Sequence, residues 1–193
     1  MGKQLKRFQY NAPVTLTYAL VSLVALVLGI MTNHATTKYF FSNYRTSMLD
    51  PMQYIRLFTH VIGHANWDHY GGNFLMILLL GPMLEEKYGS KTVLQIILVT
   101  AFITGILNIL FFDTALLGAS GIVFMMILLS SFANAETGKI PLTLVIVVII
   151  FIGKEVVNGI FVKDNISQVT HIIGGLCGGI FGYLKNKLNG KIE

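Results

Sequence analysis

Two residues of the sequence could together carry out acyl transfer: Ser120, in the tetrapeptide Gly118-Ala119-Ser120-Gly121, and His171. Each lies in an otherwise apolar stretch that is long enough to cross a membrane. Ionisable side chains are costly in hydrocarbon, so a histidine at such a position is a candidate functional residue. A serine hydroxyl beside an imidazole supplies a nucleophile and a base. The pair therefore predicts acyl transfer within the bilayer.

The composition is typical of a polytopic membrane protein. Of the 193 residues, 54% are hydrophobic and 12% are charged, and the mean hydropathy is +0.68. These values exclude an ordinary soluble domain. The net charge of +5 does not form a basic face with interleaved aromatic residues, so we expect no nucleic-acid partner. Cys177 is the only cysteine, which excludes an intrachain disulfide.

Hydropathy predicts an all-α fold with six membrane-spanning helices, each of roughly 20 residues or fewer. The predicted spans are Val14–Met31, His69–Tyr88, Val93–Phe112, Ser120–Asn134, Ile140–Val157 and Gln168–Leu184. The connection from Thr32 to Asp68 is long and amphipathic, and we expect it to form short helices at the membrane interface. No segment outside the spans is large enough for a second domain. Residues 1–193 are therefore predicted to form one membrane domain with short tails at 1–12 and 185–193.

Both termini are predicted to face the cytoplasm. An even number of spans places them on one side, and most Lys and Arg residues fall on that side, among them Lys87, Lys139 and Lys185. The first apolar run is too long for the core of a signal peptide, so we interpret it as a retained span. The lack of a soluble domain and the Ile-, Lys- and Asn-rich composition favour a bacterial plasma membrane.

Four polar side chains are predicted to lie at one level of the membrane. Ser120 and His171 each lie fourteen residues before the cytoplasmic end of their helix, which places both ~21 Å above it. Asn73 and His69 lie twelve and sixteen residues before Glu85, at ~18 Å and ~24 Å. This level is below the outer surface of a ~30 Å hydrocarbon core. Irregular backbone at that depth must line a cavity or be buried in protein, so we expect a water-filled pocket open to the outside.

Glycines at four-residue spacing could bring the two helices together. The last predicted span contains Gly174 and Gly178 on one row and Gly175 and Gly179 on the next. Such small-residue faces allow helix backbones to approach closely. Gly-xxx-Gly alone indicates ordinary helix packing, but His171 lies one turn before Gly174. The glycine face could therefore position the histidine against the helix that begins with the serine.

Together these motifs resemble those of the rhomboid family of intramembrane serine proteases, over nearly the whole chain. The nucleophile tetrapeptide resembles the family's Gly-x-Ser-Gly motif, and His171-x-x-Gly174-x-x-x-Gly178 resembles its histidine-and-glycine helix. The remaining matches to the family pattern are Arg56, His60, His64, His69, Asn73, Gly81, Glu85 and Gly89. Two positions depart from it. Ile55 replaces a tryptophan, and Phe124 stands where the family often has tyrosine.

The resemblance implies a six-helix rhomboid-like bundle that hydrolyses peptide bonds in or near transmembrane helices of other membrane proteins. Ser120 is then the nucleophile and His171 the general base of a dyad. The Ser120 backbone N–H, His69 and Asn73 would stabilise the oxyanion. The expected partners are transmembrane substrates and the lipid bilayer, and no metal or cofactor is expected.

Supporting roles are implied for Gly118, Phe124, His64, Arg56, Glu85, Gly174 and Gly178. Phe124 would stack on His171, and His64 would hold structure or water near the site. Arg56 would pin the first loop, and Glu85 would make contacts at the cytoplasmic end. No acidic residue is positioned in the sequence to orient the histidine, which favours a dyad over a triad.

Several alternatives stay open at this point. Ser120 alone could be a helix N-cap, and the predicted oxyanion donors could instead satisfy loop carbonyls. A catalytically inactive rhomboid-like protein that binds membrane clients would keep the fold. A small transporter could use His171 to relay protons. His60, His64 and His69 could share a metal ion, but the sequence contains no His-Glu-x-x-His motif.

Overall fold

Helices account for most of the residues that the structure describes, which are 9–133, 135–136, 139–161 and 165–189. In this computed structural model they are α1 (Pro13–Met31), α2 (Ala35–Phe40), α3 (Pro51–Thr59), α4 (Trp67–Tyr88), α5 (Ser90–Phe111), α6 (Ser120–Ser130), α7 (Leu142–Phe161) and α8 (Asn165–Asn189). The described residues contain one isolated β-bridge and no strand. The predicted all-α class is therefore confirmed.

The six predicted spans correspond to α1, α4, α5, α6, α7 and α8, and the predicted short helices of the first connection are α2 and α3. The boundaries differ by a few residues. α6 ends at Ser130, whereas the predicted end, Asn134, lies outside the described residues, as do residues 1–8 and 190–193 of the two tails. α8 is longer than predicted at both ends, from Asn165 to Asn189.

Two helices, α1 and α5, are long and apolar enough to cross a bilayer by length and composition. α6 is also apolar but has only 11 residues. Within the part of the chain that the structure describes, no other helix passes the same test. The six-span bundle therefore stays a prediction.

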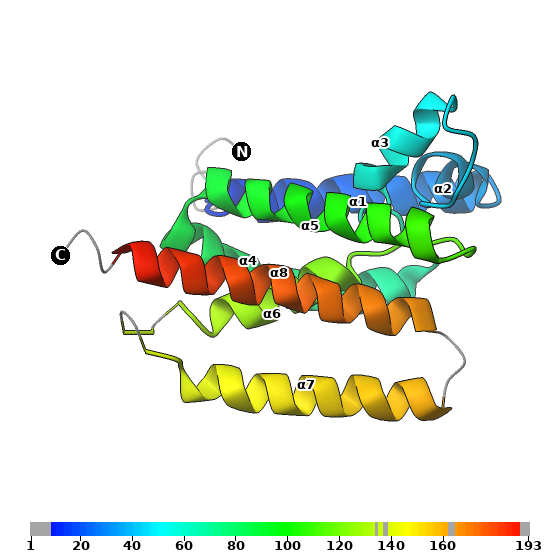
Figure 1. The fold of residues 1–193 in the computed structure, drawn as a ribbon. Coiled ribbons are helices and arrows are strands. Elements are labelled where there is room, and N and C mark those ends of the chain that lie inside the picture. The colour runs from blue at the N-terminus through cyan, green and yellow to red at the C-terminus, as the bar shows by residue number, and fades with distance from the viewer. Residues whose placement is uncertain (1–8, 134, 137–138, 162–164, 190–193) are drawn as a thin grey trace, which may run out of the picture.

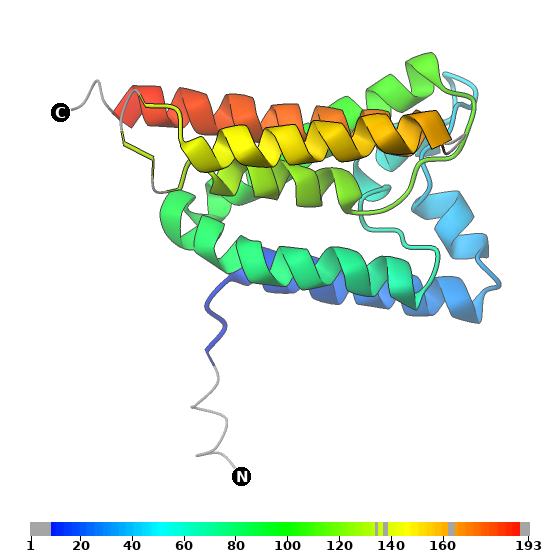
Figure 2. The same ribbon diagram turned by 90° about the horizontal axis from the view of Figure 1, so that it is seen from below.

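The long helices run side by side (Figure 1, Figure 2). α1 begins and α8 ends at the same end. The first residues of α4, α6 and α8 lie at the opposite end, together with α2 and α3. α8 contacts α5, α6 and α7, while α4 contacts α1, α5 and α6.

The most extensive helix contact joins α6 to α8, and glycines make it possible. A Cβ added to Gly174 would overlap the carbonyl oxygen of Gly121, and one added to Gly178 would overlap that of Met125. The two backbones therefore touch without side chains between them. Dispersion and packing favour such contacts where lipid replaces water as the solvent.

The C-terminal part of α4 caps the first turn of α1. The Thr15 backbone N–H donates to Glu85 Oε1 over 2.6 Å, the Thr15 hydroxyl donates to the same oxygen over 2.7 Å, and the Val14 N–H donates to Oε2 over 3.2 Å. The residue before α1, Ala12, has no side-chain acceptor for these groups. Glu85 thus satisfies N–H groups that a helix start leaves without partners, and its charge complements the helix dipole. Gly81 lies against Thr15, with no room for a Cβ.

Glu85→Ala is expected to lower the free energy of unfolding by about 1–3 kcal/mol, because it leaves buried donors of α1 without an acceptor. Glu85→Gln keeps one acceptor oxygen and should lose less. Denaturation of the purified protein in detergent measures the effect. The matched control is Glu86→Ala, which removes an exposed carboxylate from the next position. Equal losses for Glu85→Ala and Glu86→Ala would contradict the capping role.

Candidate active site

Ser120 is the first residue of α6 and is only partly buried. The backbone N–H groups of the first turn of a helix have no acceptor within the helix, and the positive end of the helix dipole lies there. A negative charge that develops on an oxygen near Ser120 would therefore be stabilised. This is the environment that attack on a carbonyl carbon requires.

The loop that leads to Ser120 (residues 112–119, the serine loop) is hydrogen-bonded to the first loop, which is the connection between α1 and α4. The bonded residues of the two loops are more than 70 positions apart in the sequence. Leu116 and Asn43 exchange two backbone hydrogen bonds of 2.8 Å. The side chain of Asn108, near the end of α5, donates to the Asn43 backbone oxygen over 3.0 Å and to the Thr114 carbonyl over 3.2 Å. Asn43 and Asn108 are both buried. One buried hydrogen-bond network thus joins the first loop, α5 and the serine loop.

Gly118 brings His69 against the serine loop. Its φ of +117° lies in the region that favours glycine. A Cβ at this position would lie 2.6 Å from His69 Nε2 and 2.7 Å from its Cε1. The Gly118 N–H donates to the carbonyl of His60 over 2.9 Å, which holds the loop in this conformation. The imidazole of His69 therefore packs on the backbone two residues before Ser120.

His64 links Asn73 to the same loop. Its Nδ1 lies 3.0 Å from the Ile62 carbonyl oxygen, which can only accept, so Nδ1 carries the proton. Its Nε2 then accepts from Asn73 Nδ2 at 3.2 Å and from the Ala119 N–H at 3.4 Å. These bonds orient the Asn73 amide, whose nitrogen has a second N–H to donate elsewhere. His64, Asn73 and the backbone beside Ser120 form one connected unit.

Burial lowers the pKa of His64 to about 4, and the nearby His69 lowers the pKa in the same direction. Burial also lowers the pKa of His60 to about 4. The ring of His60 lies between the Arg56 carbonyl oxygen, 3.1 Å from Nδ1, and the Thr104 hydroxyl, 3.3 Å from Nε2. Both rings are therefore neutral around neutral pH.

Acidification is expected to destabilise the fold through these two histidines. Their pKa values are below the ~6.5 of an unfolded histidine, so the unfolded state binds more protons between pH ~6.5 and ~4. The stabilisation is fully present above pH ~6.5 and is lost towards pH ~4, at about 1.4 kcal/mol per pH unit for each histidine. The thermal unfolding midpoint measured across this range tests the prediction.

His64→Gln should reduce the pH dependence, whereas His34→Gln, which changes an exposed histidine, should leave it as it is. A midpoint that does not change between pH ~7 and ~4.5 would contradict the assignment of neutral buried rings.

The contact between α6 and α8 places His171 beside the start of α6. Gly121 packs on Thr170, whose Cγ2 would lie 3.2 Å from a Cβ at Gly121. Ser120 precedes Gly121 and His171 follows Thr170, so the two predicted reacting residues flank a single helix contact. The Phe124 ring, one turn along α6, contacts the His171 ring with centroids 4.4 Å apart at 42°.

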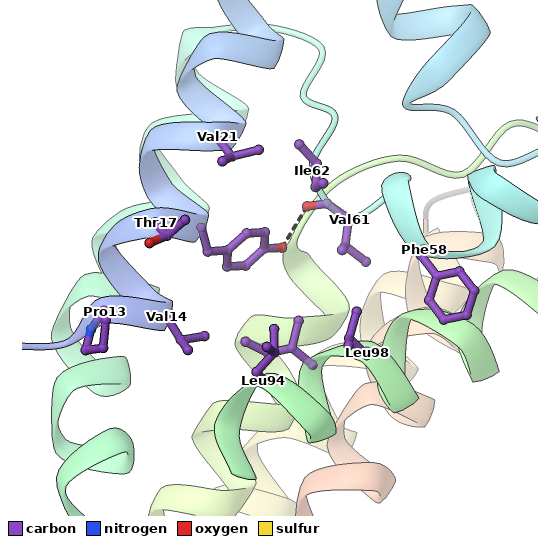
Figure 3. A pocket seen from close by; sticks show the side chains of 11 residues that line it. Pro13, Val14, Thr17, Val21, Phe58, Val61, Ile62, Leu94 and Leu98 are labelled. Carbon is purple, nitrogen blue, oxygen red and sulfur yellow. Dashed lines mark hydrogen bonds between the residues drawn. The ribbon is translucent and has the colours of Figure 1, made fainter. Parts of the chain in front are cut away.

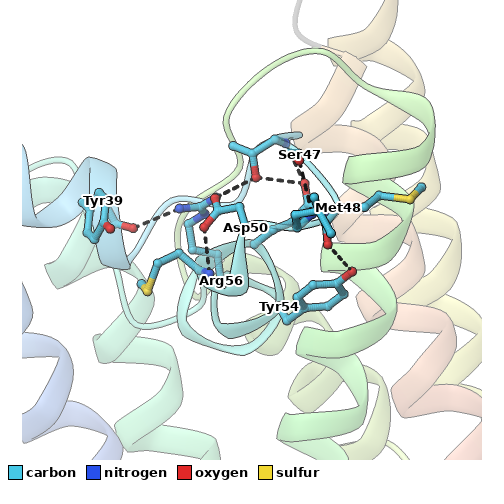
Figure 4. A network of polar contacts seen from close by, with 10 residues as sticks. Tyr39, Ser47, Met48, Asp50, Tyr54 and Arg56 are labelled. Atoms are coloured by element: carbon cyan, nitrogen blue, oxygen red, sulfur yellow. Dashed lines mark hydrogen bonds and ion pairs between the residues drawn. The ribbon is translucent and has the colours of Figure 1, made fainter.

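Arg56 lies away from this contact, in a polar network of the first loop (Figure 4). It is 1% exposed. Its Nη2 donates to Asp50 Oδ2 over 2.9 Å and to the Thr46 hydroxyl over 3.1 Å, and its Nη1 donates to the Tyr39 carbonyl over 3.3 Å. The hydrogen bond from Thr46, with those from Met52 and Arg56, lowers the pKa of the Asp50 carboxyl. Arg56 thus connects the chain after α2 to α3.

The aromatic partner of Arg56 is Tyr44, whose ring centroid lies 4.3 Å from the guanidinium carbon. Ile55, which replaces the family's tryptophan, is 48% exposed. Arg56 therefore has an aromatic neighbour, but it is Tyr44 of the loop and not the preceding residue, Ile55.

The described residues contain no group of three or more His, Cys, Asp or Glu side chains arranged to hold a metal ion. The ring nitrogens of His60 and His64 make the hydrogen bonds given above. The three histidines of the first loop and α4 therefore do not converge on a shared point as ligands would.

Sequence reasoning missed four residues that hold the site or its scaffold: Thr170, Asn43, Asn108 and Thr15. Asn108 carried the one available signal, because an asparagine within an apolar span has to find polar partners. Thr170, Asn43 and Thr15 act through contacts between distant segments and carry no local signal.

Comparison with known proteins extends this description. The sequence profile of the Rhomboid domain matches residues 51–187, a range that contains all the predicted site residues. The rhomboid protease GluP of Bacillus subtilis is 27% identical over an alignment of 184 residues that covers 90% of this chain and 35% of that protein. The chain thus spans about a third of the length of this curated relative. Because the domain match extends from the start of α3 into the last turns of α8, well over half of the chain, the protein belongs to the rhomboid family.

Proposed function

We propose that this chain is an intramembrane serine endopeptidase that hydrolyses peptide bonds in or near the transmembrane helices of other membrane proteins. Its reacting groups are Ser120 and His171. The observation that best supports the proposal is the contact of Gly121 with Thr170, which the two residues flank on adjacent helices. Membership of the rhomboid family and similarity to a rhomboid protease agree with it.

In the proposed reaction, His171 accepts the proton of the Ser120 hydroxyl as its oxygen attacks the carbonyl carbon of the substrate. The imidazolium then donates that proton to the leaving amine, and the C–N bond breaks to give an acyl-enzyme. Water hydrolyses the ester in a second step, again with His171 as the base. The Phe124 ring, whose centroid lies 4.4 Å from that of the imidazole, restricts the orientation of the imidazole.

The proposed oxyanion donors are the Ser120 N–H, the Asn73 amide and the His69 ring. His64, which also accepts from the Ala119 N–H, holds Asn73 beside the serine loop, and Gly118 leaves room for the His69 ring against that loop. Donors that are fixed before the reaction stabilise the developing charge without reorganisation. Asn73 thus acts as a hydrogen-bond donor whose amide is oriented by the neutral imidazole of His64.

Asn73→Ala is expected to reduce kcat by about 10²–10³-fold with little change in KM, because an oxyanion donor acts mainly in the transition state. Steady-state cleavage of a single-span substrate in liposomes measures both constants. Asn66→Ser is a suitable control, since it changes the neighbouring asparagine but keeps an N-cap for α4. A loss confined to KM would assign Asn73 to substrate binding instead.

We further propose that α1, α4, α5, α6, α7 and α8 all cross the membrane, within a single domain and with both termini in the cytoplasm. The start of α6 would then lie below the outer surface. Substrates would be transmembrane helices whose weak helix formers let a peptide carbonyl leave its helical hydrogen bond. A multi-pass protein of the bacterial plasma membrane fits this arrangement.

The competing proposal is a rhomboid-like protein that binds membrane clients without cleaving them. A fluorophosphonate probe separates the two, because it reacts with an activated serine. Labelling of the native chain that is lost in Ser120→Ala and in His171→Ala supports the peptidase. A native chain that folds normally but takes up no probe would support the client-binding protein.

A further inference from the structure

An apolar groove of about 420 Å³ lies between α1 and α5, away from the serine (Figure 3). Val14 and Val21 of α1 form one wall, and Leu94 and Leu98 of α5 form the other. Phe58 of α3 closes the end nearest the first loop, together with Val61 and Ile62 of the segment between α3 and α4. Nearly all of the lining surface is apolar. The groove thus runs along the side of the bundle and is closed at the end nearest the first loop.

The two walls indicate which solvent the groove meets. α1 and α5 are the helices whose length and composition suit a bilayer crossing. Wall residues Val21, Leu94 and Leu98 remain 42–45% exposed. In a membrane, such a groove opens to lipid chains rather than to water. An extended chain of methylene groups fits a narrow apolar furrow, and packing of the methylenes against its walls would favour binding.

The mouth of the groove at the far end is polar. Lys91 lies one turn before Leu94 on α5 and is exposed. The Tyr10 hydroxyl hydrogen-bonds the hydroxyl of Thr17, which also lines the groove, and Tyr10 is 55% exposed. A lysine and a tyrosine at the end of membrane helices are suited to the level of lipid headgroups. Of the two acids at this end of α4, Glu85 is engaged with α1, and Glu86 is exposed.

We propose that this groove is a binding site for one acyl chain of an anionic phospholipid, with Lys91 near its phosphate. The proposal needs the chain to lie in a membrane but does not depend on peptidase chemistry. It assigns a structural lipid to a face of the bundle that is separate from the serine, with the headgroup at the end where α1 begins.

The bound chain would support the segment that carries His64. Tyr18 projects from α1 across the groove, and its hydroxyl donates to the Val61 carbonyl over 2.7 Å. Val61 lies three residues before His64, which holds Asn73 and the Ala119 N–H. A chain packed against Tyr18 and Val61 would therefore limit movement of that segment. Removal of the lipid should loosen it.

The test is the amount of phospholipid retained by the full chain purified in mild detergent, measured by native mass spectrometry. The native chain should retain about one phospholipid. Val21→Trp fills the groove and should reduce retention to background. The matched control is Val24→Trp, the same substitution one turn along α1, at a residue that is 58% exposed and does not line the groove. Leu98→Trp fills the groove from α5 and should reduce retention in the same way. It provides the test if the Val21→Trp chain does not fold.

The headgroup is tested by titrating delipidated protein with phosphatidylglycerol and with phosphatidylcholine of the same chain length. Phosphatidylglycerol should bind more tightly, and Lys91→Gln should weaken it about fivefold, the effect of one lysine beside an anionic headgroup. All of these measurements can use the Ser120→Ala chain, so a failed peptidase proposal leaves them intact. Equal retention by Val21→Trp and Val24→Trp would overturn the site. A native dimer that carries no lipid and is lost in Val21→Trp would assign the groove to a second copy instead.

Discussion

Ser120→Ala and His171→Ala should each reduce cleavage of a single-span substrate by about 10⁴-fold or more, and the double variant should be no slower than either single variant. In the proposed reaction the two side chains act as one unit, because the hydroxyl is a weak nucleophile until the imidazole takes its proton. Loss of either one therefore removes the same step, so the effects do not add. Cleavage by purified protein in liposomes, with the native and three variant chains side by side, measures this.

Two controls belong with that experiment. Ser130→Ala removes a serine from the last turn of α6, whose hydroxyl bonds its own helix at the Ile127 carbonyl. His34→Ala removes an exposed histidine before α2. Both should cleave at close to the native rate. Residual cleavage by Ser120→Ala near the native level would refute the assignment of the nucleophile, and additive losses would separate the roles of the two residues.

The second large effect is expected for Gly174→Ala, at the contact between α6 and α8. A Cβ there would overlap the carbonyl carbon and oxygen of Gly121, and backbone atoms cannot move aside as a flexible side chain can. Overpacking of this kind costs about 1–3 kcal/mol of stability. It also separates the helices that carry Ser120 and His171, and a displacement of about 1 Å can slow a reaction about 10²-fold. Gly174→Ala should therefore lower both the unfolding midpoint and the cleavage rate.

Gly179→Ala is the matched control, because the nearest atom to a Cβ at that position is Leu128 Cδ1 at 4.0 Å. It makes the same chemical change on the same helix, and it should be neutral or slightly stabilising through helix propensity. If Gly174→Ala and Gly179→Ala behave alike in both measurements, the close approach at Gly121 does not hold the site together.

The parts of the fold that the sequence predicted are those carried by local pattern. Apolar runs predicted six apolar helices, and the amphipathic connection predicted short ones between the first two, which are α2 and α3. The glycine rows predicted a close approach to the last helix, and in the structure Gly174 and Gly178 of α8 pack against the backbone of α6. Ser120 was predicted to begin its helix because an irregular loop precedes it, and it does. Local spacing was sufficient for each of these.

The parts that were missed depend on pairs of distant residues. Glu85 was expected to make contacts at its end of the bundle, but nothing in the sequence identifies Thr15 as its partner, 70 residues earlier. The stack of Arg56 on Tyr44 likewise depends on how a loop folds back. Helix ends were displaced by a few residues, as for α6 at Ser130, because hydropathy does not register where capping stops a helix.

The paired backbone bonds between Asn43 and Leu116 have a mechanical consequence. They couple the chain that precedes α3 to the peptide that precedes Ser120, the proposed nucleophile, and Asn108 of α5 hydrogen-bonds to both segments. An incoming helix that displaced the segment at Asn43 would therefore also move the segment at Leu116. Entry of a substrate and realignment of the serine would then proceed as one concerted rearrangement rather than as two successive ones.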